Sequence, residues 1–268
     1  MRLSPAPVPL SHATYGRGAH IVLLHGVGLD GTMWERCVPA LAADHRVTVA
    51  DLRGHGGSPP AALGVRLDDL AADVAALLDG PAHLVGFSLG ALVAQHLALA
   101  APRSTASLTL VSSVAGRSDT ERAAVALRRA RAREDFAGSA RAAVERWFSP
   151  EWREREPALA GTVLDRLLSN DRTSYLACYD VFATADAALW PELPRITAPT
   201  LAVTGSDDPG STPQMSRRLA SRIPNGRAMV VPGARHLLPL ECPEALNDAI
   251  LQHIGSPAAR TAQESHPV

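Results

Sequence analysis

The sequence contains no lysine: all 26 residues counted as Lys or Arg are arginine. A Schiff-base mechanism and a covalent anchor for pyridoxal phosphate both need a lysine amine, so both are excluded. Cysteine is scarce as well. The three cysteines, Cys37, Cys178 and Cys242, lie far apart and form no C-x-x-C pair of the kind that binds zinc or performs redox chemistry. We therefore expect buried thiols in a reducing compartment, no metal site and no cofactor.

Strong net charge and long apolar runs are also missing. The formal net charge is -1, and no basic block is present that could follow a phosphate backbone. No run reaches about 18 apolar residues, and residues 1–16 contain three prolines instead of the apolar core of a signal peptide. We therefore expect a cytoplasmic protein that takes a small-molecule substrate and binds neither nucleic acid nor a membrane. The oligomeric state is left open.

What the chain does contain is a regular alternation of two kinds of segment. Hydrophobic residues make up 46% of it, which is enough for a sizeable core. Residues 66–79 carry leucine and valine at helical spacing, with aspartates near the start. Short apolar, β-branched runs typical of buried parallel strands occupy residues 20–26, 46–52, 82–88, 107–113, 199–205 and 226–233. The alternation predicts an α/β fold with a doubly wound, mostly parallel sheet.

One stretch interrupts this pattern. Residues 116–195 contain no strand-like run and are typical of several helices rich in Arg, Ala and Glu. They hold eight of the eleven aromatic residues, namely Phe136, Trp147, Phe148, Trp152, Tyr175, Tyr179, Phe182 and Trp190. We predict a helical lid at 116–195, inserted into a core domain of 1–115 and 196–254, with a disordered tail at 255–268. Most of these rings should form the lid's own core, with two or three lining a pocket.

The segment Gly86–Gly90, GFSLG, carries the main chemical signal. It follows a strand-like run and opens a helix-like run, which is the strand, sharp turn and helix of a nucleophile elbow. The glycines leave room for the close backbone approach in such a turn. We predict Ser88 as the nucleophile; the alternative is a turn serine that only caps the helix.

A serine nucleophile needs a base, and the base needs an orienting acid. Both follow downstream, in the order Ser, acid, His that accompanies a nucleophile elbow. His236 follows the last strand-like run and is the predicted base. Asp208 is the preferred acid because it lies three residues after the glycine that ends a strand. Asp207 next to it and Asp119, after the run at 107–113, remain as alternatives.

Acyl transfer also needs donors for the developing oxyanion, usually backbone N–H groups. Leu89, directly after the nucleophile, supplies one of them. The N–H of Val27, in the loop after the first strong strand, should supply the other. His25 in the same loop is more often a structural hydrogen-bonding residue, and we leave it out of the triad.

Taken together, these motifs resemble the α/β-hydrolase superfamily over nearly the whole chain. They are HGVG at 25–28, DLRGHGGS at 51–58, GFSLG at 86–90, GSDDP at 205–209 and GARH at 233–236. The runs ERWFSP at 145–150, YLACY at 175–179 and GSDDPGSTP at 205–213 are similar to 3-oxoadipate enol-lactonases of aromatic catabolism. That resemblance implies hydrolysis of a small enol-lactone or ester that carries a carboxylate, with Trp147 and Arg146 of the lid as candidate substrate contacts.

Other functions fit the same residues. The triad could cleave a carbon–carbon bond in a vinylogous diketone, or the site could serve a cofactor-free perhydrolase or haloperoxidase. From a different class, the scaffold could be a ligand receptor or a non-hydrolytic lyase, because a fold does not fix a function. Dehalogenases and epoxide hydrolases of this fold use a carboxylate nucleophile, and the serine at position 88 disfavours them.

Overall fold

A seven-stranded sheet forms the centre of the computed structural model, which describes residues 1–4, 6–256 and 259. The strand order is β1-β3-β2-β4-β5-β6-β7; β1 is antiparallel to β3, and the other neighbouring pairs are parallel. The strands are β1 (His12–Tyr15), β2 (Ala19–Leu24), β3 (His45–Ala50), β4 (Ala82–Phe87), β5 (Thr105–Val111), β6 (Thr200–Gly205) and β7 (Gly226–Val231). The predicted mostly parallel sheet is confirmed.

The six parallel strands are the six predicted from apolar runs. Every residue of β4, β5 and β6 is buried, as expected for strands covered on both faces. β1 was not predicted. Its sequence HATY is exposed at every position, so this edge strand shows neither an apolar run nor an alternating pattern.

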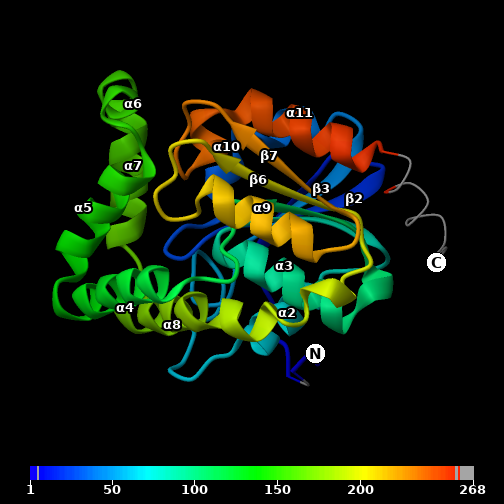
Figure 1. The fold of residues 1–268 in the computed structure, drawn as a ribbon, viewed down its shortest axis with the longest axis horizontal. Helices are drawn as coiled ribbons and strands as arrows, with labels where there is room; N and C mark the ends of the chain where they lie inside the picture. Colours follow the sequence, from blue (N-terminus) through cyan, green and yellow to red (C-terminus); the bar gives the residue numbers. More distant parts are fainter. Residues whose placement is uncertain (5, 257–258, 260–268) are drawn as a thin grey trace.

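Helices cover both faces of the sheet. Helices α1 and α11 pack on one face, whereas α2, α3 and α9 pack on the other, where Figure 1 shows α9 in front of the strands. Their bounds are α1 (Val38–Leu41), α2 (Leu67–Ala75), α3 (Leu89–Ala100), α9 (Pro213–Arg222), α10 (Leu238–Glu241) and α11 (Pro243–Ile254), and short 3-10 turns lie at η1 (Gly31–Trp34), η2 (Pro102–Ser104) and η3 (Leu193–Arg195). This is the doubly wound arrangement.

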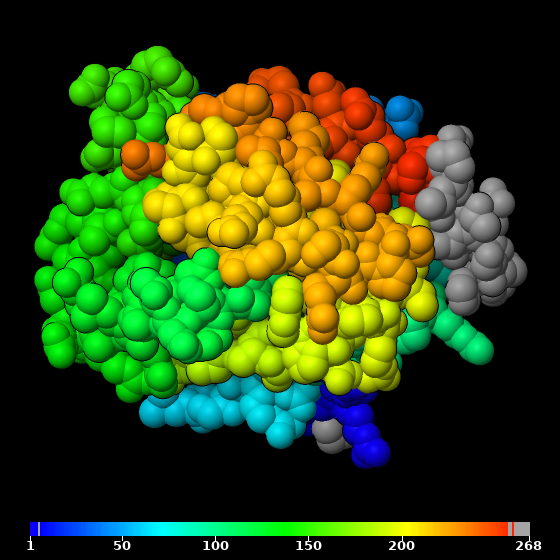
Figure 2. Space-filling model, in the orientation of Figure 1, coloured from blue at the N-terminus to red at the C-terminus, as the bar shows by residue number. Residues whose placement is uncertain are grey.

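The inserted segment, residues 116–195, connects β5 to β6. The structure describes all of its residues, and none of them belongs to a strand. Its helices are α4 (Asp119–Glu134), α5 (Phe136–Trp147), α6 (Pro150–Arg155), α7 (Pro157–Leu168) and α8 (Arg172–Leu189). Helices α4 to α7 stand together at one end of the molecule in Figure 1, and α8 runs from that end toward α3; Figure 2 shows the segment packed directly against the part that carries the sheet.

The strand register brings the loops at one edge of the sheet together. Leu24 in β2 pairs with Gly86 in β4, and Phe87 pairs with Val111 in β5. Gly205 of β6 pairs with Val231 of β7. Because these strands are parallel, the residues that follow them emerge at the same edge, which is where ligands bind in open α/β sheets.

Two further expectations concern the whole chain. No helix among the described residues is long and apolar enough to cross a membrane. The tail predicted at 255–268 lies almost entirely outside the described residues, which beyond position 254 include only 255, 256 and 259.

Candidate active site

Ser88 lies on a tight turn between β4 and α3. Its backbone has a φ of 51° and a ψ of -109°, a conformation that a residue with a side chain rarely adopts and that persists where the surrounding structure enforces it. A Cβ atom on Gly86 would lie 2.3 Å from the carbonyl oxygen of Gly90, and one on Gly90 would lie 2.5 Å from that of Leu24. The two glycines therefore make the turn possible, as the sequence pattern predicted.

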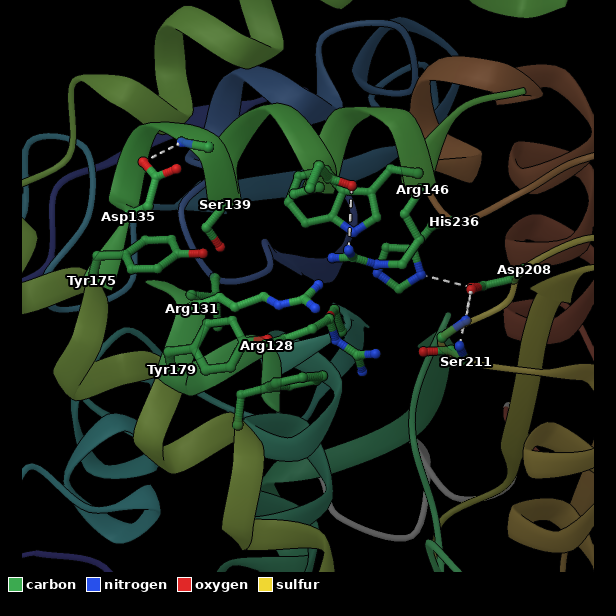
Figure 3. A pocket seen from close by; sticks show the side chains of 18 of the residues that line it. Arg128, Arg131, Asp135, Ser139, Arg146, Tyr175, Tyr179, Asp208, Ser211 and His236 are labelled. Atoms are coloured by element: carbon green, nitrogen blue, oxygen red, sulfur yellow. Dashed lines mark hydrogen bonds and ion pairs between the residues drawn. The ribbon is translucent and has the colours of Figure 1, made fainter. Parts of the chain in front are cut away.

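His236 and Asp208 meet at the same edge of the sheet. The Nδ1 atom of His236 lies 2.6 Å from Oδ2 of Asp208, and both residues are buried. The other carboxylate oxygen of Asp208 accepts the N–H groups of Gly210, at 2.8 Å, and Ser211, at 2.9 Å. A carboxylate held in this way fixes the proton of the imidazole on Nδ1 and leaves Nε2 as an acceptor on the cavity side (Figure 3).

The two alternative acids lie elsewhere. Asp207 is exposed, and its carboxylate accepts the hydroxyl of Ser206 at 2.7 Å. Asp119 begins α4, where its side chain is 98% exposed and pairs with Arg122. Of the three candidate carboxylates, the structure brings only Asp208 to His236.

The two N–H groups predicted as oxyanion donors are those of Val27 and Leu89. Within the described residues, neither the N–H of Val27 nor that of Leu89 has a hydrogen-bond partner, and Leu89 opens α3, where the N–H groups of the first turn have no partner inside the helix. The amide of Gly90 is already engaged with the carbonyl of His25 at 3.0 Å. This bond ties the loop after β2 to the elbow.

His25 holds that loop from inside. Its Nε2 accepts the N–H of Leu52 at 2.8 Å, so Nδ1 carries the proton and donates to the carbonyl of Gly26 at 2.7 Å. The ring is fully buried, and burial lowers the pKa of His25 and keeps it neutral. The structural role expected for His25 agrees with these contacts.

A cavity of about 320 Å³ joins these groups to the inserted segment. Ser88, His236, Asp208 and Val27 line its floor from the sheet side. Four of the eight aromatic residues of the inserted segment line it from above, which is more than the two or three expected: Trp147, Tyr175, Tyr179 and Phe182. Phe148 and Trp152 stack on each other instead, with ring centroids 4.1 Å apart.

Both predicted contacts of the inserted segment, Trp147 and Arg146, lie in this cavity. The Trp147 ring stacks on the His236 ring, with a centroid distance of 5.8 Å and an interplanar angle of 23°. The Arg146 guanidinium donates to the carbonyl of Ala142 in its own helix, at 3.3 Å. Burial lowers the pKa of Arg146, although a guanidinium remains charged in proteins.

Hydrogen bonds attach the loop that carries His236 to the inserted segment and to the sheet. The N–H of His236 donates to the carbonyl of Trp147 at 3.1 Å. The guanidinium of Arg235 donates to the carbonyls of Phe148, at 3.1 Å, and Glu145, at 3.2 Å. The hydroxyl of Ser112, after β5, donates to the carbonyl of His236 at 2.8 Å. The loop that carries His236 is therefore fixed between the sheet and the end of α5.

The sequence did not single out two cationic residues of the cavity, Arg128 and Arg131 on α4. The only available signal was the arginine-rich run of that helix, which does not show which side chains face inward. Among the described residues, no group of His, Cys, Asp and Glu is arranged to hold a metal ion.

The model of the alpha/beta hydrolase family matches residues 21–249, so the chain belongs to this family and is an enzyme of the hydrolase class. Among its relatives, (E)-2-((N-methylformamido)methylene)succinate hydrolase of Acinetobacter baylyi is 29% identical over 239 residues, covering 88% of this chain and 90% of that protein. The 3-oxoadipate enol-lactonase 2 of the same organism is 29% identical over 256 residues, covering 92% and 94%.

A solved structure gives the same result. The enol-lactonase from Burkholderia xenovorans LB400 superimposes with a TM-score of 0.85 at 28% identity, covering 92% of this chain and 96% of that one. The resemblance to α/β hydrolases and to enol-lactonases predicted from the motifs is confirmed.

Proposed function

We propose that this protein is a serine hydrolase that cleaves a small ester or lactone through an acyl-enzyme on Ser88. The observation that carries the proposal is the convergence of three features in one cavity: a serine on a strained turn, a histidine oriented by a carboxylate at 2.6 Å, and free backbone N–H groups beside the serine. This is the set of groups that acyl transfer needs.

The first half of the reaction follows from the tautomer of the base. The Ser88 hydroxyl attacks the carbonyl carbon as Nε2 of His236 takes its proton, and Asp208 stabilises the imidazolium. The N–H groups of Val27 and Leu89 stabilise the oxyanion of the tetrahedral intermediate. The imidazolium then returns the proton to the leaving oxygen. In a lactone that oxygen stays attached to the acyl chain, so the ring opens without loss of a fragment.

The second half regenerates the enzyme. Water attacks the acyl-enzyme as His236 takes one of its protons, and the imidazolium returns that proton to Oγ of Ser88 as the acyl–oxygen bond breaks and the acid product leaves. We propose that the inserted segment acts as a lid that excludes bulk water from this chemistry, with the core formed by 1–115 and 196–254. Its aromatic side chains over the cavity and its hydrogen bonds to the loop of His236 support this role.

The substrate we propose carries a carboxylate. Arg146 lies in the cavity with no carboxylate partner among the described residues. The names of two relatives, an enol-lactonase of an oxoadipate and a hydrolase of a substituted methylenesuccinate, describe acidic substrates, and the site here offers a cation for such a group.

The test is a hydrolysis screen of the wild type and Ser88→Ala against enol-lactones, p-nitrophenyl esters and a vinylogous diketone. We expect Ser88-dependent cleavage of a lactone or ester, with a burst of p-nitrophenol when the substrate is a p-nitrophenyl ester and a covalent adduct on Ser88 after treatment with an organophosphonate. Ser113→Ala, a buried serine outside the cavity lining, is the matched control. Undiminished turnover by Ser88→Ala would refute the proposal, and preference for the diketone would replace it with carbon–carbon cleavage.

A further inference from the structure

Three arginines from two consecutive helices share the cavity above Ser88. Arg128 and Arg131 come from α4, and Arg146 comes from α5. Figure 3 shows their side chains extending toward one another across the space between the two helices, beside His236. The three side chains thus define a cationic subsite next to the proposed catalytic groups.

No carboxylate neutralises this subsite. Among the described residues, none of the three arginines lies in an ion pair, and the one hydrogen bond that their side chains make is that of Arg146 to its own helix. Other arginines of α4 are paired: Arg122 with Asp119, and Arg129 and Arg133 with Asp180. On α4, the arginines without ion-pair partners are therefore those that line the cavity.

Two of the three acidic residues that line the cavity have other partners. Asp208 holds His236, and Asp135 accepts the N–H of Gly138 at 2.8 Å as the cap of α5. Glu134 is exposed and, in the described part of the chain, takes part in no ion pair. Burial and the charge of Arg128 both lower the pKa of Arg146, which is the effect expected when like charges crowd one space.

We propose that the substrate carries two negative charges beyond the carbonyl that Ser88 attacks, as two carboxylates or as one phosphate-type group. One carboxylate can form a bidentate pair with one guanidinium, which would leave the other two cations uncompensated. A dianionic head provides enough oxygens to contact all three guanidinium groups and compensates two of their three charges. The inference rests on the proposed function and makes Arg128 and Arg131 residues that determine specificity.

The experiment measures binding rather than turnover, in the Ser88→Ala background, by calorimetry. The ligands are intact methyl esters of increasing charge: methyl butyrate, monomethyl glutarate, the 1-methyl ester of tricarballylate, and the carboxylic methyl ester of 4-phosphonobutyrate. We expect the last two, which are dianions at pH 9, where the measurement is made, to bind at least about tenfold more tightly than monomethyl glutarate. The tighter of the two dianions identifies the head group as dicarboxylate or phosphate-type.

Substitutions connect this preference to the subsite. In the same background, Arg128→Gln and Arg131→Gln should each weaken dianion binding by roughly ten- to a hundredfold, the size of one charge-assisted hydrogen-bonded contact. The affinity for methyl butyrate, which is neutral, should stay unchanged in both variants. Arg141→Gln is the matched control, because Arg141 lies on α5 but is exposed and outside the cavity lining. Arg131 is itself exposed, so its variant tests the subsite even if Arg128→Gln fails to fold.

The outcomes separate this inference from the proposed function. Equal binding of monoanionic and dianionic esters, binding of neither up to millimolar concentrations, or arginine variants that match Arg141→Gln would overturn the inference and leave the role of Ser88 untouched. Turnover that survives Ser88→Ala would overturn the proposed function, whereas the charge preference measured here would stand.

Discussion

Replacing Asp208 with Asn tests the proposed acid more sharply than deleting it, because the two side chains have the same shape. In the structure one oxygen of Asp208 accepts two backbone N–H groups, from Gly210 and Ser211, and the other accepts the proton on Nδ1 of His236. An Asn side chain has only one oxygen. That oxygen should stay with the two N–H groups, which places the amide NH2 against Nδ1.

The magnitude follows from this geometry. An NH2 group facing Nδ1 makes that atom an acceptor, so the proton of the imidazole moves to Nε2, and His236 can no longer take the proton of Ser88. In the chymotrypsin-type triad the same change lowers kcat by ~10⁴-fold, which corresponds to about 5.4 kcal/mol of transition-state stabilisation. We expect a loss of that order in kcat, with little change in KM.

Asp207→Asn is the control, because Asp207 lies next in sequence, is exposed, and among the described residues its side chain hydrogen-bonds only to the hydroxyl of Ser206. It should change kcat less than about twofold. The assay is steady-state hydrolysis of the best substrate from the screen, with circular dichroism of each variant to confirm folding. Equal losses in the two variants, or a loss at Asp208 that appears only in KM, would refute the assignment of the acid.

Two further predictions concern stability. Burial raises the pKa of Glu241 from 4.5 to about 7, so the folded protein holds a proton that the unfolded chain releases between these values, and stability should fall as the pH rises from about 5 to 7. Glu241→Gln should flatten this pH dependence and raise the free energy of unfolding at pH 8, measured with urea, by about 1 to 3 kcal/mol. Glu244→Gln, on the exposed surface, should change neither. The buried pair of Arg117 and Asp186, 2.6 Å apart, predicts that Arg117→Met costs about 3 kcal/mol or more, against less than about 1 for the exposed Arg195→Met; similar melting temperatures would contradict this.

The sheet could be predicted from sequence because its parallel strands are buried on both faces. Such strands must be apolar throughout, so β4, β5 and β6 appear as continuous hydrophobic runs. The edge strand β1 could not be found in this way. Its HATY sequence pairs antiparallel with β3, and the backbone hydrogen bonds of that pairing leave no mark on residue type.

The candidate site likewise contains residues that a local sequence pattern marks and residues that only packing selects. The tight turn at Ser88 was predictable because such a turn accepts few residues around it, and the pattern Gly86–Gly90 reflects that steric demand. Asp208 was preferred over Asp207 by spacing, and the structure shows why spacing matters: the loop after β6 turns only one of the two side chains toward His236. Arg128 and Arg131 could not be selected, because α4 carries arginine on several faces and only packing determines which of them point inward.

The inserted segment also links recognition to chemistry through a single helix. The end of α5 presents Arg146 to the cavity, places the Trp147 ring on His236, and accepts the His236 N–H at the carbonyl of Trp147. Arg235 adds two more hydrogen bonds to the same helix end. Displacement of α5 would therefore remove both a cation from the cavity and the backbone support from His236. In the proposed mechanism, a substrate anion bound by Arg146 would hold α5 in place and with it His236, so that binding energy remote from the scissile bond would help to orient the proposed base.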